Sequence, residues 1–279
     1  MTTTIREGVR AITAYLSDHG IDAAPRDARL IVAHALGVET GRLTLLEHDP
    51  LTVETETAMR ALAARRAEHT PMSHILGYRE FWGRRFEVNA DVLDPRPETE
   101  TLIAAALEGD FSNLLDLGTG SGAIAVTLLA ERETAQGTAT DVSDAALAVA
   151  ARNARELRVA DRLSFLGSNW FEAVEGTYDL IVSNPPYIAA LEMDELQPEV
   201  RIHEPRIALT DDADGLSAYR AIFAGARKHV RPGSRIIVEF GAGQGPDVEE
   251  IARAEGWSDT SFRADLSGKH RVLVAKDPV

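Results

Sequence analysis

Residues 113–132 constrain the fold of this chain more than any other stretch, because they combine a strand, a glycine-rich turn and a helix. Residues 113–117 form a short apolar run, which is typical of a buried parallel strand. Residues 118–122 read Gly-Thr-Gly-Ser-Gly, and residues 123–132 repeat apolar side chains as a helix does. Glycines in such a turn let a ligand approach the backbone, and the helix N-terminus adds N–H donors. The stretch therefore predicts an α/β domain with a ligand site at the end of this strand.

The spacing of the glycines indicates the kind of ligand. Dinucleotide sites have the pattern Gly-x-Gly-x-x-Gly, whereas here the third glycine comes one residue early and Asp116 precedes the turn. This is the form that binds S-adenosylmethionine, a ligand with a carboxylate and a ribose but no pyrophosphate. The next predicted strand, 137–140, ends at Asp141. An acidic residue about 20 positions after the turn suits a bidentate grip on ribose hydroxyls.

A second motif follows another short apolar run. Residues 178–182 predict a buried parallel strand, and Asn184, Pro185, Pro186 and Tyr187 come where that strand leaves the sheet. Ligands of open α/β sheets bind beyond the carboxyl ends of the strands. Proline lacks a backbone donor, fixes φ and favours an extended residue before it. The motif therefore predicts a stiff corner with one side-chain amide, free carbonyl acceptors and one aromatic face.

Such a corner suits a planar NH2 group on an sp² carbon. This group is a poor nucleophile because its lone pair is delocalised, and it carries two N–H donors in one plane. Asn184 Oδ1 and the Pro185 carbonyl can accept both hydrogen bonds and favour positive charge on the nitrogen, while Tyr187 covers a face of the plane. A proline-rich turn without chemistry is the alternative for this tetrapeptide alone.

The chain after residue 96 alternates strands and helices, which indicates one α/β domain over residues 96–279. Beyond the strands already described, we expect strands near 162–166, 235–240, 260–265 and 271–275. The last two are close enough in sequence to form an antiparallel hairpin at the sheet edge. Helices are expected near 144–157, 216–230 and 246–256, and residues 167–170 follow a strand end where an adenine can lie.

The first 75 residues predict a small helical domain. Ile5, Val9, Ile12 and Leu16 repeat at helical spacing, and further helices are expected from 25 to 37, from 39 to 46 and from 52 to about 69. This part has no glycine-rich loop and no metal-ligand spacing, so we expect it to recognise a partner. Residues 76–95 have aromatic side chains on both sides of a glycine and predict a β-hairpin linker.

Composition excludes several classes of protein. The chain has no cysteine, which excludes disulfides and cysteine-ligated metal sites. Its net charge of −15 argues against general nucleic-acid binding, which depends on basic residues that meet phosphates. No apolar run reaches about 18 residues, and the first residues lack the regions of a signal peptide. We therefore expect a cytoplasmic protein with no metal site, no direct nucleic-acid partner and no membrane association.

Together these motifs resemble the HemK/PrmC family over nearly the whole chain. These protein-(glutamine-N5) methyltransferases modify the Gly-Gly-Gln motif of bacterial class I peptide chain release factors, which act in translation termination. The resemblance is carried by residues 80–83, 95–100, 116–122, 183–187, 204–209 and 215–216. It implies a Rossmann-like class I S-adenosylmethionine-dependent methyltransferase domain with a seven-stranded mixed sheet, preceded by a small helical bundle and a β-hairpin linker.

The resemblance also implies roles for individual residues. It implies that S-adenosyl-L-methionine contacts Gly118, Thr119, Gly120, Ser121, Gly122, Asp141, Trp170 and Asn184. It also implies that Asn184, Pro185, Pro186 and Tyr187 bind the substrate glutamine. Of these, Asn184, Pro185 and Tyr187 are the implied catalytic residues. Methyl transfer is direct and leaves S-adenosyl-L-homocysteine. Two positions depart from the family: Asn169 stands where Asp is frequent, and Asp94 where an apolar residue is usual. The Asn169 side-chain oxygen can still accept a hydrogen bond from the adenine amino group.

Three other functions stay open. A sister enzyme methylates a glutamine of a ribosomal protein, and the sequence separates the two only weakly. A DNA or RNA adenine N6-methyltransferase uses a similar tetrapeptide on a flipped base, and the acidic net charge counts against it. A non-enzymatic S-adenosylmethionine-binding module would explain the glycine-rich turn but would leave residues 184–187 without a purpose.

Overall fold

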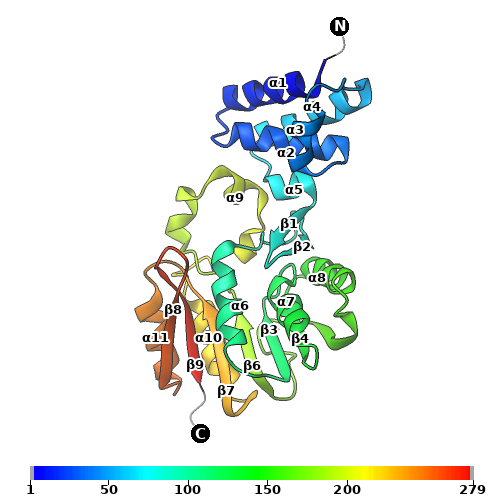
Figure 1. Cartoon of the computed structure of the whole chain (residues 1–279). Helices are drawn as coiled ribbons and strands as arrows, with labels where there is room; N and C mark the ends of the chain where they lie inside the picture. Colours follow the sequence, from blue (N-terminus) through cyan, green and yellow to red (C-terminus); the bar gives the residue numbers. More distant parts are fainter. Residues whose placement is uncertain (1–2, 277–279) are drawn as a thin grey trace. The chain divides into compact units, whose positions relative to one another are not determined.

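The computed structural model describes residues 3–276 and divides into two compact units (Figure 1). The first unit comprises the chain up to Gly77 together with Gln197–His203. The second comprises Tyr78–Leu196 and the chain from Glu204 onward. Across residues 3–276, no helix is both long enough and apolar enough to cross a membrane.

The first unit is helical, as the sequence predicts. Its helices are α1 (Ile5–Asp18), α2 (Ala24–Leu36), α3 (Leu43–Leu46), α4 (Val53–Ala67), α5 (Met72–Leu76) and α9 (Pro198–His203), with a 3₁₀ turn η1 (Thr40–Arg42). Thr4 caps α1 through a capping box with Glu7, and Gly37 ends α2 in the left-handed conformation. The helices α5 and α9 were not predicted, because each is too short to show a period.

A buried ion pair lies inside this helical unit. Arg66 of α4 donates to Asp27 of α2 over 2.8 Å and to Glu199 of α9 over 3.0 Å. His203, at the end of α9, is 3.1 Å from the backbone carbonyl of Glu68. These contacts explain why a segment far along the chain folds with the first unit.

The second unit contains a seven-stranded sheet of order β5-β4-β3-β6-β7-β9-β8, which confirms the predicted mixed sheet. Its strands are β3 (Asn113–Leu117), β4 (Gln136–Asp141), β5 (Leu163–Gly167), β6 (Tyr178–Ser183), β7 (Val230–Glu239), β8 (Asp259–Ala264) and β9 (His270–Lys276). The strands β3 to β7 run parallel, and β9 is antiparallel to both β7 and β8. The predicted hairpin at one edge is therefore present.

Helices cover both faces of this sheet, as Figure 1 shows. They are α6 (Glu100–Leu107), α7 (Ala123–Glu131), α8 (Asp144–Glu156), α10 (Ser217–Ala226) and α11 (Gly245–Ala254). One apolar cluster joins α6 and α7 to one face, and a second joins α10 and α11 to the other. The helix expected to extend to residue 230 ends at Ala226, because β7 begins at Val230, five residues before the predicted start.

The hairpin expected as a linker packs on the second unit. It consists of β1 (Tyr78–Phe81) and β2 (Arg84–Glu87), and the two loop residues, Trp82 and Gly83, have φ values of 50° and 67°. Positive φ at both positions matches the right-handed twist of the strands. Phe81 and Phe86 are buried in the apolar cluster that contains α6 and α7.

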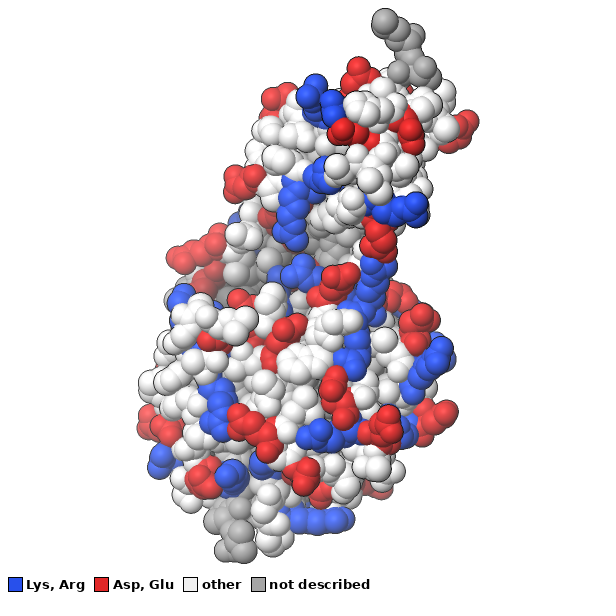
Figure 2. Space-filling view, viewed as in Figure 1, with Lys and Arg blue, Asp and Glu red and all other residues white. Residues whose placement is uncertain are grey.

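Charged side chains are interspersed on the face of the molecule that Figure 2 shows. Acidic side chains stand beside the basic ones over that face. Two basic residues of the hairpin also have acidic partners, since Arg84 pairs with Glu131 and Arg85 with Glu80.

The long connection between β6 and β7 folds back on itself, so that residues near its start pair with residues about 20 positions later. Ile188 N donates to the Leu209 carbonyl over 3.0 Å, and Ala190 N to the Ala213 carbonyl over 3.0 Å. Besides α9, the connection contains the 3₁₀ turns η4 (Ala190–Glu195) and η5 (Arg206–Ala208), where we expected an irregular loop. Its return depends on Gly215, which has φ of 75° and whose missing Cβ would lie 2.3 Å from the Tyr187 carbonyl oxygen.

We expect Gly215→Ala to destabilise the protein by about 2–4 kcal/mol, because it combines left-handed strain with a clash against backbone. Gly176→Ala is the matched control, since Gly176 has φ of 80° but nothing within 4 Å of an added Cβ. Strain alone should cost this variant about 1 kcal/mol. Urea unfolding followed by circular dichroism measures both values, and equal losses would show that the clash is relieved without cost.

Candidate active site

The parallel strands end level with one another, and this brings polar residues together. Leu117 of β3 pairs with Thr140 of β4 on one side and with Ser183 of β6 on the other. Ser183 in turn pairs with Val238 of β7. The residues that follow this row stand side by side at the carboxyl edge of the sheet: Gly118, Asp141, Asn184 and Glu239.

A cavity of about 630 Å³ lies at this edge, a size that suits a nucleoside-like ligand. Of the predicted site residues, it is lined by Gly118, Thr119, Gly120, Ser121, Asp141, Trp170, Asn184 and Pro186. The other lining residues come from 91–96, Thr99, 123–124, 142–143, Ala146, 168–169, 205–208, 210–212 and 217–218. Among the described residues, Gly122, Pro185 and Tyr187 are predicted site residues that do not line it.

The glycine-rich turn is shaped for close approach of a ligand. Gly118, Gly120 and Gly122 all have positive φ, between 54° and 81°. Asp141 holds the turn in place, because Gly120 N donates to its Oδ2 over 2.9 Å. Its Oδ1 accepts from Ser143 N over 2.9 Å. A carboxylate has about four acceptor positions, so Asp141 retains capacity for two ligand hydroxyls.

Asp116, in β3, supports the same turn. It is fully buried, and its Oδ2 accepts from Thr119 Oγ1 over 2.6 Å and from Ala125 N over 3.2 Å. Burial raises the pKa of Asp116 to about 7, against the lowering effect of these two hydrogen bonds. Its Oδ1 has no hydrogen-bond partner. The side chain of Thr119 therefore serves the turn, and so does its backbone, since Thr119 N donates to the Thr140 carbonyl and Gly122 N donates to the Thr119 carbonyl.

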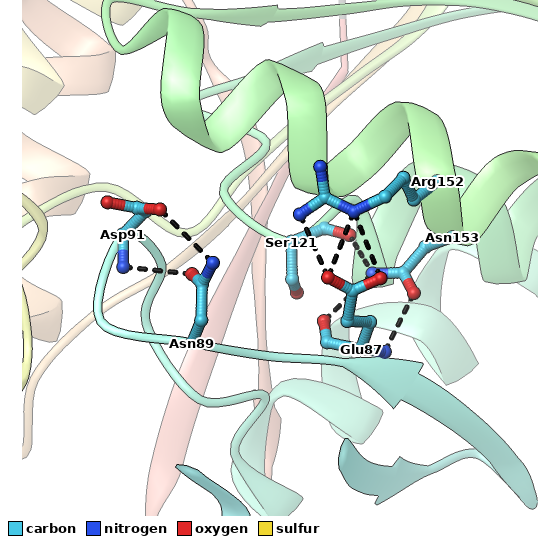
Figure 3. Close-up of polar contacts among 6 residues, drawn as sticks. All are labelled: Glu87, Asn89, Asp91, Ser121, Arg152 and Asn153. Carbon is cyan, nitrogen blue, oxygen red and sulfur yellow. Dashed lines mark hydrogen bonds and ion pairs between the residues drawn. The ribbon is translucent and has the colours of Figure 1, made fainter. Parts of the chain in front are cut away.

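Asn153 joins the glycine-rich turn to the β-hairpin, as Figure 3 shows. This residue of α8 is 2% exposed. Its Nδ2 donates to the Ser121 carbonyl over 2.8 Å and to the Glu87 carbonyl over 3.0 Å, and its Oδ1 accepts from Glu87 N over 2.7 Å. Arg152 adds an ion pair with the Glu87 side chain at 2.8 Å.

Asn153 was not predicted from the sequence as a site residue. The signal was present, because Asn153 shares the buried face of α8 with Ala146, Val149, Ala150 and Ala154. A polar residue on an apolar helix face requires buried partners. What those partners are depends on how α8 packs, which the sequence does not show.

The Asn-Pro-Pro-Tyr corner places one free acceptor at the cavity. Asn184 Nδ2 donates to Thr99 Oγ1 over 3.2 Å, whereas Asn184 Oδ1 is buried and has no hydrogen-bond partner. Tyr187 is partly buried against the apolar cluster of α10 and α11, and Gln244 Nε2 donates to its carbonyl over 2.8 Å. Burial raises the pKa of the Tyr187 phenol, so this group stays neutral.

Trp170 and Asn169 border the cavity beyond β5. Trp170 has φ of 50°, and Ser168 Oγ donates to its carbonyl over 2.9 Å, which fixes this unusual conformation. Asn169 Nδ2 donates to Glu172 Oε1 over 2.8 Å, so its own Oδ1 remains an acceptor.

Two loops that border the cavity are joined by an ion pair. Arg96 Nη2 donates to both oxygens of Glu204, over 2.8 and 2.6 Å. Burial raises the pKa of Glu204 to about 7, while Arg96 lowers it and Asp94 raises it further. Asp94 is itself buried in this loop.

Glu239 is a further buried carboxyl at this edge that we did not predict. It is 1% exposed at the end of β7, and its Oε2 has no hydrogen-bond partner. The signal was an acidic residue directly after the apolar run of 236–238. Within residues 3–276 there is no group of three or more His, Asp or Glu side chains placed to hold a metal ion.

Family models and known proteins match most of this chain. A family model described as PrmC N-terminal domain matches residues 7–77, and one described as methyltransferase small domain matches residues 93–214. The chain is 53% identical over 272 residues to a release factor glutamine methyltransferase of Cereibacter sphaeroides, with 98% of each chain covered. It is 43% identical to that of Rhodospirillum rubrum, covering 92% of this chain and 80% of the relative.

Solved structures support the fold at much lower identity. The hMettl16 catalytic domain matches with a TM-score of 0.59 and 17% identity, over 77% of this chain and 81% of that one. A methyltransferase from Pyrococcus furiosus matches with a TM-score of 0.56 and 17% identity, over 78% of this chain and all of that one.

We expect Asn153→Ala to cost about 1–3 kcal/mol of unfolding free energy, because it leaves the Ser121 carbonyl and Glu87 N–H buried without partners. Its neighbour provides the control. Arg152→Ala removes an ion pair whose side chains are each about two-fifths exposed, and it should cost less than about 1 kcal/mol. Urea unfolding measures both, and equal losses would contradict the role given to Asn153.

We expect Asp116 to make stability depend on pH. Its pKa of about 7 in the folded protein lies above the unfolded value of 3.8, so the folded state holds a proton that the unfolded state releases between these values. Stability should therefore fall as pH rises, on the order of 2 kcal/mol between pH 5 and pH 8. Asp116→Asn should lose this part of the slope. Urea unfolding at four pH values tests it, and parallel curves for the two proteins would contradict it.

Proposed function

The chain belongs to the family of release factor glutamine methyltransferases, and from this premise we propose its reaction. The protein methylates the side-chain amide nitrogen (N5) of the glutamine in the Gly-Gly-Gln motif of class I peptide chain release factors. S-adenosyl-L-methionine is the methyl donor. Because release factors work in translation termination, we place the reaction in the cytoplasm.

One observation carries this proposal. Asn184 Oδ1 is a buried acceptor without a hydrogen-bond partner, in a residue that lines the cavity. A buried polar atom of this kind requires a donor, and the N–H groups of a substrate amide are suitable donors. Pro185 follows directly, and its carbonyl can take the second N–H group.

The residues around the cavity fit the methyl donor. The turn of residues 118–122 offers a backbone without side-chain bulk, Asp141 has free acceptor positions for the ribose, and Trp170 and Asn169 stand where an adenine would lie. S-adenosyl-L-methionine supplies a methyl group on a sulfonium and becomes S-adenosyl-L-homocysteine. We assign Gly122 to the turn's geometry, since it caps α7 and its missing Cβ would lie 3.0 Å from Ala150 Cβ.

The corner activates the amide nitrogen by position and by its acceptors. As the nitrogen forms its bond to the methyl carbon, the carbon–sulfur bond breaks and positive charge develops on nitrogen. Asn184 Oδ1 and the Pro185 carbonyl stabilise this charge because both accept N–H groups of the same nitrogen. The nitrogen then releases a proton and recovers a neutral amide. Pro186 and Tyr187 hold the corner rigid, the latter through its packing and its carbonyl.

We propose that the helical unit and the hairpin serve the protein substrate. The domain limits that we adopt are 1–75 for recognition, 76–95 for the hairpin and 96–279 for methyl transfer. Direct binding of nucleic acid has little support from charge, because the net charge is −15 and acidic side chains stand beside basic ones on the face in Figure 2.

A labelling experiment tests the reaction and the substrate together. The protein is incubated with methyl-labelled S-adenosyl-L-methionine and, in separate arms, an intact release factor, the same factor with Gln→Ala in its Gly-Gly-Gln motif, a ribosomal-protein fraction and DNA. We expect label on the intact release factor alone. Label on ribosomal protein or DNA instead would assign the enzyme to one of those substrates.

We expect Asn184→Ala to lower turnover by about two to three orders of magnitude, as for loss of one preorganised polar group. Asn113→Ala is the control, because Asn113 lies at the opposite end of β3 and donates to the Thr177 carbonyl far from the cavity. Single-turnover labelling of the release factor measures both. Near-normal turnover by Asn184→Ala would remove this residue from the mechanism.

A further inference from the structure

The side-chain amide of Asn184 ends in an oxygen, Oδ1, and a nitrogen, Nδ2, and only the oxygen serves the proposed reaction. Oδ1 accepts hydrogen bonds, whereas Nδ2 donates them. A substrate amide nitrogen brings two N–H donors. If the Asn184 amide were rotated by 180°, its Nδ2 donor would face these N–H donors and no hydrogen bond could form. The protein must therefore select one orientation, and this reasoning rests on the proposed function.

Thr99 provides the contact that distinguishes the two orientations. It is 4% exposed and ends the 3₁₀ turn η2 (Pro97–Thr99) before α6. Its Oγ1 lies 3.2 Å from Asn184 Nδ2. A hydroxyl can donate only one proton, so its role toward Asn184 depends on where that proton goes.

Glu239 is placed to take that proton. It follows Val238, which pairs with Ser183, so it stands next to Asn184 in the row at the sheet edge. Burial raises the pKa of Glu239 to about 7, and the polar side chains of Thr99 and Asn184 lower this pKa. An ionised carboxylate can only accept.

We infer that Thr99 and Glu239 are positioning residues that hold the Asn184 amide with Oδ1 toward the cavity. The Glu239 carboxylate takes the Thr99 proton. The Thr99 oxygen can then only accept, and the atom facing it must be Nδ2. Oδ1 is thereby left for the substrate, in agreement with its lack of a partner inside the protein.

Protonation of Glu239 would reverse this selection. A carboxylic acid donates to Thr99, whose own proton is then free to meet Asn184 Oδ1. The other charged or titratable groups that act on Glu239 are Glu98, Arg271, Tyr187 and Tyr219. Only Arg271 among them is positive, and its Nε also donates to Asp265 over 3.1 Å. Turnover should therefore rise with pH through neutrality.

The test compares Thr99→Val, which keeps the shape and removes the hydroxyl, with Thr99→Ser, which keeps the hydroxyl. We expect Thr99→Val to lower kcat about tenfold, as for one hydrogen bond, with the Kd for S-adenosyl-L-methionine within about twofold of wild type. Thr99→Ser should restore most of kcat. Thermal unfolding of each variant shows whether it is folded, and a folded Thr99→Val with normal kcat would overturn the inference.

The pH profile tests Glu239 separately. Glu239→Gln keeps an acceptor but cannot titrate, so the ratio of wild-type kcat to variant kcat should rise between pH 6 and pH 8. A merely structural role would leave this ratio constant. The effect of Thr99→Val should also vanish in an Asn184→Ala background, because the two residues act as one unit. A Thr99→Val effect of unchanged size in that background would contradict the inference.

A spectroscopic measurement separates this inference from the proposed function. The Nδ2 protons of Asn184 are identified in ¹⁵N-labelled protein by their absence from Asn184→Ala. They should shift in Thr99→Val, because they lose the Thr99 acceptor. Failure of the wild type to label the release factor would overturn the proposed function. An unmoved Asn184 resonance would overturn the positioning role, whether or not the wild type is active.

Discussion

Backbone pairing at one row of the parallel sheet sets the position of the polar groups at the cavity. The row joins β4, β3, β6 and β7 through Thr140, Leu117, Ser183 and Val238. A slip of one residue in any of these strands would turn its side chains to the opposite face and move its terminal group. Before the row, β3, β6 and β7 contribute buried side chains to the apolar clusters on both faces of the sheet, so such a slip would also expose or misplace core side chains. The core thus fixes the site.

Burial of carboxyl groups at this edge of the sheet lowers the stability of the folded protein. Asp116 and Glu239 are both almost inaccessible, and each keeps one oxygen without a partner. An unpaired buried polar atom typically costs about 1–3 kcal/mol. The flanking apolar clusters, which include residues of α6, α7, α10 and α11, can tolerate this cost. In return the groups act in a low dielectric, where hydrogen bonds orient their partners more strongly than in water.

The sequence predicted the parts of this arrangement that depend on local patterns. The strand of β3, its glycine turn and α7 follow from a short apolar run, three glycines and a helical period, and the structure has all three. Short elements such as α5 and α9 escaped prediction, because five or six residues show no period. Thr99, Asn153 and Glu239 escaped for another reason. Thr99 bonds to a residue 85 positions away, and Asn153 bonds to residues 66 and 32 positions away. Glu239 comes close to Asn184 only through the order of the strands in the sheet. Which distant residues meet such buried polar side chains depends on how the strands and helices pack, and local sequence patterns do not show this.

The choice of an amide at position 184 follows from the neighbouring carboxyl. An aspartate there would place a second buried carboxyl beside Glu239, and like charges in one site raise the pKa of one of them. The protonated group would present a donor where the substrate nitrogen also brings donors. Asparagine supplies the acceptor without a second charge. Its amide oxygen and nitrogen differ, however, so the protein must direct the oxygen toward the substrate. An amide in this corner therefore requires a neighbour that can only accept from it, and Thr99 meets that requirement while its own proton is held by Glu239.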